Sequence, residues 1–292
     1  MASWRDGMLS WREDGLDLPF RPFWTAALIL TIIFASKAGL SSVWAIVAYY
    51  LGSIIVWFVV TVLVYIIFVW LLSLTVDLDK PVTENHPIIR RIVVSIIGIL
   101  CRVGRLRIHV KGWENIPKEG KFLWVGNHRS NYDPIATVWI MHHYGVPIAF
   151  ITKPENMKIP LVRLIHRANY LVINRDDPRK AISTINAAAE LLKNDVVNVG
   201  VYPEGTRSKG VEMLPFHNAV FKIAQKANVP MVVASVTGTE NIHKNAPWQR
   251  TDVTVDFCAC ISPEEVKSSS TKDLGDRVRA LLEDAAAQAE HA

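Results

Sequence analysis

The apolar segment between Ala38 and Val76 constrains this chain more than any other feature of its sequence. It contains no Asp, Glu, Lys or Arg, and Trp, Ile, Val, Phe and Leu dominate it. A helix crosses the hydrocarbon core of a bilayer in about 20 residues, so the segment is long enough for one span. A helix that is apolar on every side needs an apolar solvent on every side, which argues against the core of a soluble domain. We therefore expect a membrane anchor.

A second apolar segment, Phe23–Ala35, precedes the first and is closed by the turn-like residues Ser36–Gly39. The two segments predict a transmembrane helical hairpin, with a short arm near residues 22–37 and a long arm near residues 43–76. The sequence is compatible with one span or two. A signal peptide is a poor alternative, because the apolar stretch is too long for its hydrophobic region and no small-residue cleavage site follows it.

The whole sequence carries a net charge of +5. Arginines cluster just after the anchor, at Arg90, Arg91, Arg102, Arg105 and Arg107. Basic residues that flank a span mark its cytoplasmic side and attract anionic lipid. We therefore expect an integral membrane protein whose remaining domain faces the cytoplasm, with a membrane lipid and not nucleic acid as its partner.

The cysteines are too few and too scattered for a zinc site. Cys101 is isolated, and Cys258 and Cys260 lie two residues apart in a strand-like stretch. We expect small buried hydrophobic side chains in a reducing compartment, with no disulfide and no bound metal.

The sequence divides into three zones: an N-terminal membrane anchor at residues 1–76, a basic interfacial connection at 77–112, and one α/β domain at 113–292. In the last zone, short apolar runs end in polar residues and are followed by helix-like sequence. These runs are Phe122–Val125, Ile148–Ile151, Tyr170–Ile173 and Val196–Tyr202. Continuous apolar strands that alternate with helices predict a mostly parallel sheet flanked by helices. Ligands of such sheets gather beyond the carboxyl ends of the strands. The polar groups that follow these runs should therefore converge.

The first candidate chemical group is the segment from Asn127 to Pro134. His128 and Asp133 are too far apart in sequence to share a helix face, but a tight turn would bring them together. Pro134 suits the first helical position and Asp133 the N-cap, where the helix dipole keeps a carboxylate ionised. The carboxylate could then accept a hydrogen bond from one imidazole nitrogen and leave the other as a base. Alternatively, Asp133 is only a helix cap and His128 only a loop residue.

The second candidate segment runs from Tyr202 to Ser208. A buried strand stops at Pro203, Gly205 lets the backbone approach a ligand, and the donors of Thr206 and Arg207 follow. Arginine binds phosphate through two parallel hydrogen bonds, so this chemistry suits an anionic phosphate. The alternative is an ordinary strand-to-helix turn with an exposed arginine.

In this order, the two segments resemble the glycerolipid acyltransferase family, whose best-known members are 1-acylglycerol-3-phosphate (lysophosphatidic acid) acyltransferases. Asn127, His128 and Asp133 match the family's first block in full. Its Phe-Pro-Glu-Gly-Thr-Arg-Ser block is matched from Pro203 to Ser208, with Tyr202 in place of the phenylalanine. The resemblance covers about Trp113–Cys260.

The chain also departs from the family pattern. In the second block Ile173 and Arg175 fit, but Asn169 and Val172 stand where glycine and phenylalanine are common. A fourth, apolar block is present at Val229–Val233, with Ala234 in place of a second proline. His217 and Asn218 follow Phe216, where the family often has lysine and glycine. The loss of a cation here leaves the head group of the acceptor open.

The resemblance implies transfer of a fatty acyl group from acyl-CoA or acyl carrier protein to the free hydroxyl of 1-acylglycerol-3-phosphate, which gives phosphatidic acid. It implies His128 as the general base and Asp133 as the group that orients it. The implied substrate-binding residues are Lys153, Arg175, Glu204, Gly205, Thr206 and Arg207, with Glu204 ordering the loop. No cofactor is expected beyond the thioester co-substrate.

Other functions remain open to the sequence. Within the same class, the acceptor would be glycerol-3-phosphate, a complete lysophospholipid or a lyso-aminolipid. A non-catalytic protein that binds anionic lipid is a further alternative, although binding alone does not require the His128–Asp133 pair. A secondary transporter is disfavoured because one hairpin is too little membrane for it.

Overall fold

The computed structural model describes residues 21–37, 39, 42–78, 84, 86–208 and 212–290. The chain separates into two compact units, one that ends at Thr75 and one that begins at Val76 and runs through the rest of the chain. Each unit is described by itself.

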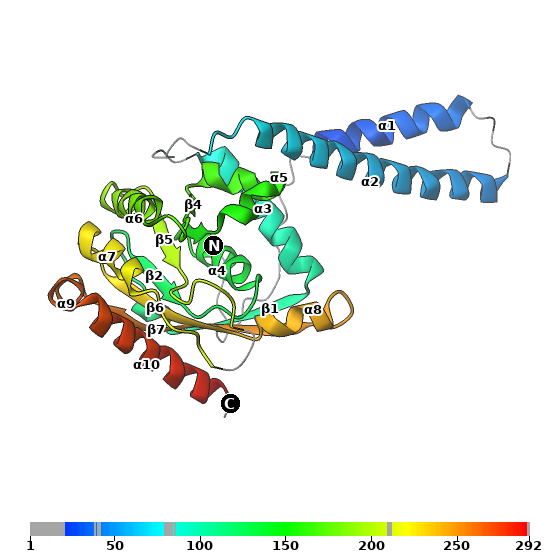
Figure 1. Ribbon diagram of the computed structural model, residues 1–292. Coiled ribbons are helices and arrows are strands. Elements are labelled where there is room, and N and C mark those ends of the chain that lie inside the picture. Colours follow the sequence, from blue (N-terminus) through cyan, green and yellow to red (C-terminus); the bar gives the residue numbers. More distant parts are fainter. Residues whose placement is uncertain are drawn as a thin grey trace. The chain divides into compact units, whose positions relative to one another are not determined.

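The first unit is a pair of helices, α1 (Arg21–Lys37) and α2 (Val43–Leu74), that pack side by side (Figure 1). The indole N–H of Trp57 donates a hydrogen bond to the Thr31 hydroxyl across the pair, at 3.0 Å. Within α2, the hydroxyl groups of Ser53 and Thr61 bond back to carbonyl oxygens one turn earlier. Polar groups satisfied inside their own helix suit an apolar solvent.

Among the described helices, α2 is the one that is long and apolar enough to cross a membrane, while the apolar part of α1 is the shorter Thr25–Ala35. Large apolar side chains project outward from α2, and Trp44, at 81% exposed, is an example. The candidate span therefore coincides with the predicted long arm. A hairpin with both arms in the membrane stays a prediction.

The second unit is a seven-stranded sheet flanked by helices. Its strands are β1 (Leu106–Lys111), β2 (Leu123–Gly126), β3 (Ile148–Thr152), β4 (Leu171–Val172), β5 (Asn198–Val201), β6 (Met231–Thr237) and β7 (Thr251–Ile261). Its longer helices are α3 (Pro87–Val103), α4 (Asp133–His143), α6 (Pro178–Lys193), α7 (Lys222–Ala227), α9 (Pro263–Ser268) and α10 (Thr271–Glu290). Two short helices, α5 (Pro160–Arg163) and α8 (Ile242–Asn245), and several 3₁₀ turns lie among the connections.

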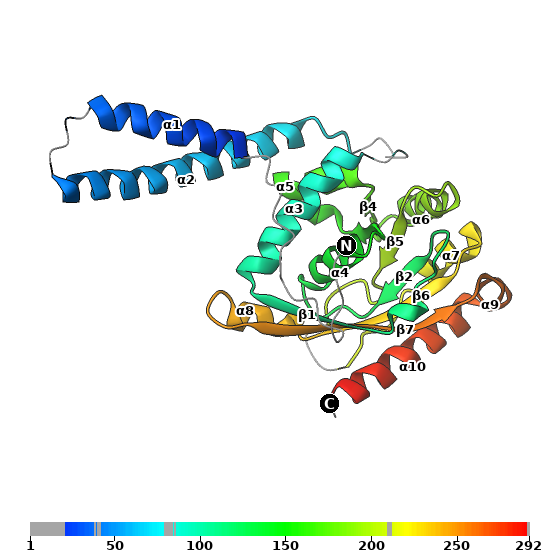
Figure 2. The same ribbon diagram turned by 180° about the vertical axis from the view of Figure 1, so that it is seen from behind.

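The strand order is β1-β7-β6-β2-β5-β3-β4, and every neighbouring pair is parallel except β6 and β7. The connection through α4 leads from β2 towards β3, whereas those through α6 and α7 lead in the opposite direction along the sheet. Right-handed crossovers then place α4 on one face and α6 and α7 on the other. Helix α3 packs on α4, and α10 covers β6 and β7 on the α7 side (Figure 1 and Figure 2). The predicted fold class, a mostly parallel sheet flanked by helices, is confirmed.

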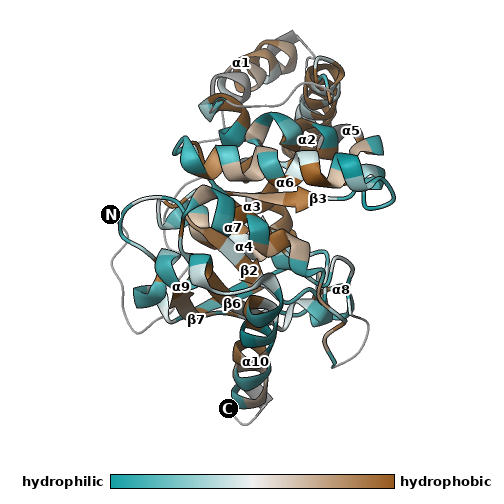
Figure 3. Cartoon of the chain, turned by 60° about the vertical axis from the view of Figure 1, so that its left-hand side comes forward, coloured by the Kyte–Doolittle hydropathy of each residue, from teal (hydrophilic) through white to brown (hydrophobic). Residues whose placement is uncertain are grey.

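The core lies on both sides of the central strand β2. Leu123 is in register with Val199 of β5 and with Met231 of β6, and all three side chains are buried. Figure 3 shows hydrophobic residues along the strands, whereas helices such as α6 and α10 carry both hydrophilic and hydrophobic residues. A strand covered on both faces must be apolar at every position, which is why these strands were visible as continuous apolar runs.

The segment predicted as a connection, residues 77–112, contributes α3 and β1 to the second unit. In β1, Leu106 and Ile108 are buried, whereas Arg107 and His109 are partly exposed, so only alternate residues are apolar. This half-buried pattern is typical of a strand with one covered face. Such a strand contains no continuous apolar run, so it was not predicted from the sequence. An interfacial location for this segment stays a prediction.

Gly200 of β5 offers a test of the tight packing at the centre of the sheet. A Cβ atom at this position would overlap the Phe150 ring, which is itself fixed between Trp124 and Tyr202. We expect Gly200→Ala to lower the free energy of unfolding by about 1–3 kcal/mol, because overpacking forces the surrounding side chains out of their minima. Thermal unfolding in detergent would measure the loss.

Gly52→Ala is the matched control, because a Cβ atom at Gly52 meets no atom within 4 Å. Equal melting temperatures for Gly200→Ala and the unaltered protein would contradict the packing described here.

Candidate active site

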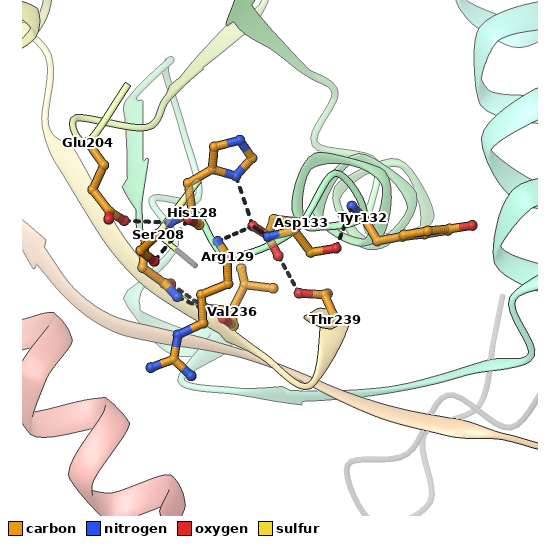
Figure 4. A network of polar contacts seen from close by, with 10 residues as sticks. His128, Arg129, Tyr132, Asp133, Glu204, Ser208, Val236 and Thr239 are labelled. Carbon is orange, nitrogen blue, oxygen red and sulfur yellow. Dashed lines mark hydrogen bonds and ion pairs between the residues drawn. The ribbon is translucent and has the colours of Figure 1, made fainter. Parts of the chain in front are cut away.

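Three neighbouring strands deliver polar residues to one edge of the sheet. His128 follows β2, Glu204 follows β5 and Thr239 follows β6, and β2 lies between the other two strands. Figure 4 shows the three side chains around the start of α4, joined by a network of hydrogen bonds. This is the edge where parallel sheets place their ligands.

His128 and Asp133 are paired directly. The Nδ1 atom of His128 lies 2.9 Å from Oδ2 of Asp133, whose side chain is fully buried, while that of His128 is 18% exposed. The same carboxylate oxygen accepts the backbone N–H groups of Arg129 at 2.7 Å and Ser130 at 2.8 Å. The hydroxyl of Thr239 donates to the other oxygen, Oδ1. Four donors occupy the acceptor sites of one carboxylate, so Asp133 is ionised and Nδ1 of His128 carries the proton.

The capping role predicted for Asp133 is wrong in detail. Helix α4 begins at Asp133 itself, with Tyr132 at the N-cap and Pro134 in the first turn. The carboxylate turns back towards the preceding loop, because the N–H groups of Arg129 and Ser130 and the imidazole lie on that side. The residue still lies in the first turn of the helix, where the dipole favours a negative charge.

The imidazole is held by stacking as well as by its hydrogen bond. The His128 ring stacks on Tyr202 with 4.3 Å between ring centroids, and Tyr202 stacks on Phe150 at 5.1 Å. Burial, assisted by the Asp133 charge, raises the pKa of Tyr202 well above its ordinary value, so the phenol stays neutral. Within the described part of the chain, no group hydrogen-bonds to Nε2 of His128, which lies across the ring from Asp133 (Figure 4). This nitrogen therefore has a lone pair available as a base.

The two sequence motifs are tied together on both sides of His128. The backbone N–H of His128 donates to Oε1 of Glu204 at 2.7 Å, and its carbonyl oxygen accepts the N–H of Ser208 at 2.8 Å. The second carboxylate oxygen of Glu204 accepts the N–H of Leu214 at 2.9 Å. Glu204 is buried, and both of its carboxylate oxygens accept hydrogen bonds from backbone N–H groups. This arrangement suits a residue that orders the loop better than one that contacts a phosphate.

The predicted substrate-binding residues are only partly brought together. Gly205 has a φ of +69°, and a Cβ atom there would overlap the guanidinium of Arg175, so this arginine lies directly against the loop. Partial burial lowers the pKa of Arg175, and the nearby Glu155 acts in the opposite direction. Thr206 and Arg207 are exposed beside Gly205. Lys153 is exposed at the end of β3, and no described interaction links its side chain to this loop.

One departure from the family pattern has a structural reason. Asn169 has a φ of +71°, a left-handed conformation that glycine adopts freely and asparagine tolerates better than most residues. Its side-chain oxygen accepts a hydrogen bond from Arg90 at 2.8 Å. Burial lowers the pKa of Arg90, and its hydrogen bond to Asn169 gives this arginine of the basic cluster a role in the fold.

Thr239 is the residue of the site that the sequence reasoning missed. The sequence did contain a clue, because Thr239 follows an apolar strand just as His128 does. The segment Thr237–Thr239 has no charged residue, however, so it was not picked out as a candidate. The stacking role of Tyr202 was also missed, since its aromatic character was read only as part of a motif. No group of three or more His, Cys, Asp or Glu side chains within the described residues is arranged to hold a metal ion.

Comparison with known proteins shows which family this site resembles. Residues 107–237 match the family model described as Acyltransferase. A 1-acyl-sn-glycerol-3-phosphate acyltransferase of Salmonella typhimurium is 27% identical over 187 residues, which cover 64% of this chain and 75% of the relative. The 1-acyl-sn-glycerol-3-phosphate acyltransferase alpha of Ovis aries is 29% identical over 199 residues, or 67% of each protein.

A solved structure agrees with this assignment. The crystal structure of the 1-acyl-sn-glycerophosphate (LPA) acyltransferase PlsC from Thermotoga maritima is similar, with a TM-score of 0.56 and 26% sequence identity. The match covers 80% of this chain and 92% of that one. Fold and motifs together define an O-acyltransferase. In motifs, family-model match and fold, the chain is similar to the glycerolipid acyltransferase family, as its motifs predicted.

Thr239 gives a direct test of the site. Thr239→Val removes the one hydrogen bond that the described residues make to Oδ1 of Asp133, and it preserves the shape of the side chain. Losing the partner of a buried charged group costs about 1–3 kcal/mol. If the whole of this free energy is added to the activation barrier, kcat falls by about 5- to 150-fold. Initial rates of acyl transfer would measure it.

Thr239→Ser should restore most of the rate, because it returns the hydroxyl. Thr254→Val, a change of the same kind on β7, is the control and should be near normal. A kcat for Thr239→Val within twofold of the unaltered enzyme would refute the role of this hydrogen bond.

Proposed function

We propose that this enzyme transfers a fatty acyl group from a thioester to the free hydroxyl of 1-acylglycerol-3-phosphate and so makes phosphatidic acid. The observation that carries the proposal is the imidazole of His128, which a buried carboxylate orients through Nδ1 while Nε2 has no hydrogen-bond partner among the described residues. The names of the relatives support the acceptor, because both are 1-acyl-sn-glycerol-3-phosphate acyltransferases. The reaction belongs to phospholipid biosynthesis.

The reaction proceeds in one ternary complex. Nε2 of His128 removes the proton of the acceptor hydroxyl as its oxygen attacks the thioester carbonyl carbon. A C–O bond forms, the C–S bond breaks, and the sulfur leaves with the proton that His128 returns. Asp133 stabilises the imidazolium that forms in between. A positioned base of this kind contributes about 10²–10⁴-fold to the rate.

The acceptor phosphate binds at the loop from Gly205 to Arg207. Arg207 and Arg175 supply guanidinium groups, and the Thr206 hydroxyl and the glycine backbone complete the pocket. Gly205 is suited to this place because a side chain there would displace Arg175. Glu204 contributes by ordering the loop, and Lys153 adds a positive charge at the rim.

The donor is acyl-CoA or acyl carrier protein, both of which present the same thioester arm, and no further cofactor takes part. Helix α2 anchors the enzyme in the membrane, and the catalytic unit lies at the cytoplasmic face, where thioester donors are made. The candidate span and the basic residues that follow it in the sequence support this placement.

Replacing the base tests the mechanism. We expect His128→Ala to lower kcat by about 10²–10⁴-fold, because the variant lacks the imidazole proposed as the base, while acceptor binding stays nearly unchanged. Turnover would be followed with a radiolabelled acyl thioester, offered both as acyl-CoA and as acyl carrier protein. His243→Ala, an exposed histidine on α8, is the control. Near-normal turnover by the His128 variant would overturn the mechanism.

Arg207→Ala tests the acceptor. Losing a hydrogen bond to a charged group costs about 1.5–3 kcal/mol, so KM for 1-acylglycerol-3-phosphate should rise by about 10- to 150-fold with a smaller change in kcat. Arg179→Ala, an exposed arginine on α6, should leave both constants unchanged. A panel with glycerol-3-phosphate, lysophospholipids without a terminal phosphate and lyso-aminolipids completes the test. Preference for one of these acceptors would replace the one proposed.

A further inference from the structure

The C-terminal helix α10 lies outside residues 107–237, which match the family model, yet it is built into the catalytic unit. Leu274, Val278 and Leu282 are almost fully buried and recur at four-residue spacing, so one apolar stripe of the helix packs on the sheet. Gly275 lies against the side chain of Asn218, where any larger residue on the helix would collide. The position of α10 is therefore fixed by close packing.

From this fixed position, Arg279 holds residues 213–216, which lie between the second motif and α7. Its guanidinium donates hydrogen bonds to the backbone carbonyl oxygens of Met213, at 3.3 Å, and Leu214. Its central carbon also lies 4.4 Å from the centroid of the Phe216 ring. Glu283, one turn further along the helix, steadies the same guanidinium at 3.5 Å. A charged donor to backbone carbonyls makes a stronger hydrogen bond than a neutral one.

A chain of hydrogen bonds leads from this arginine to the catalytic histidine. The carbonyl of Leu214 accepts from Arg279, and its N–H donates to Glu204 at 2.9 Å. The other carboxylate oxygen of Glu204 accepts the backbone N–H of His128 at 2.7 Å. One residue, Leu214, is thus held at both of its backbone groups.

This contact adjoins the place where the chain departs from its family. His217 and Asn218 stand where lysine and glycine are frequent, and the N–H of His217 donates to the carbonyl of Pro203, at 2.8 Å, beside Glu204. Helix α10 provides both a guanidinium over Phe216 and the small residue, Gly275, that accommodates Asn218. The altered segment and the helix therefore fit each other.

We propose that Arg279 is a positioning residue for acyl transfer, which acts through Leu214 and Glu204 to keep His128 in place. The proposal rests on the proposed function, in which His128 is the base. A contact that only attaches α10 to the fold would change stability and leave the rate of the folded enzyme alone. A positioning contact lowers kcat in a protein that is still folded.

The test compares three variants of the full-length enzyme in detergent. Arg279→Met keeps the length of the side chain and removes its donors, and we expect kcat to fall about tenfold with KM for both substrates within about twofold, since a misplacement of about 1 Å can cost 10²-fold. Arg279→Lys keeps the charge but places its donors on a single nitrogen, and its kcat should lie between those of Arg279→Met and the unaltered enzyme. Arg277→Met, on the same helix, removes an exposed partner of Glu265 and should be normal.

Hydrogen exchange of the folded variants supplies a second readout. Exchange in the peptide that contains Met213 to His217 should become faster in Arg279→Met, because the N–H of Leu214 loses its fixed place, while β6 exchanges as before. A normal kcat, or unchanged exchange at Leu214, would overturn the proposal. If Arg279→Met unfolds, Arg279→Lys decides: a folded enzyme with full kcat overturns the proposal, and one with reduced kcat supports it.

His128→Ala separates this proposal from the one on which it rests. If that variant is inactive and Arg279→Met is normal, only the role of Arg279 fails. If His128→Ala retains its turnover, the proposed function fails whatever the Arg279 variants do.

Discussion

The buried carboxylate of Asp133 is the interaction on which the rest of the site depends. An ionised group without water is tolerated only where donors replace its hydration, and here two backbone N–H groups, an imidazole and a hydroxyl do so. The tight bend after β2 exists to aim those N–H groups at the carboxylate. The same bend fixes His128. The hydrogen bond between them gives the buried Asp133 carboxylate a donor and holds the His128 imidazole in one orientation.

The sheet supplies the remaining geometry. Because β5, β2 and β6 are neighbours and run in the same direction, Glu204, His128 and Thr239 arrive at one edge although they are far apart in sequence. Stacking of the imidazole on Tyr202 and hydrogen bonds to both sides of its backbone remove most of its freedom. An arrangement that is rigid before substrate binds is what efficient general base catalysis requires.

Much of this was visible in the sequence. Continuous apolar runs revealed most of the central strands. A possible turn between His128 and Asp133, together with the family resemblance, predicted that these two side chains meet. Strand β1 was not found, because alternating polar residues conceal a half-covered strand. The direction of the Asp133 carboxylate and the contribution of Thr239 could not be found either, since both depend on how loops from different strands meet. Sequence reports which residues can bond, and tertiary packing decides which of them do.

The distance along the chain between partners has a consequence for the timing of activity. Thr239 follows Asp133 by 106 residues, and the helix that carries Arg279 comes later still. Chains fold from the N-terminus during synthesis, so the candidate membrane span emerges long before the hydrogen bonds around Asp133 are complete. Under the proposed function, a chain still on the ribosome would therefore reach the membrane through its candidate span before it could transfer an acyl group, and only the finished molecule would be active.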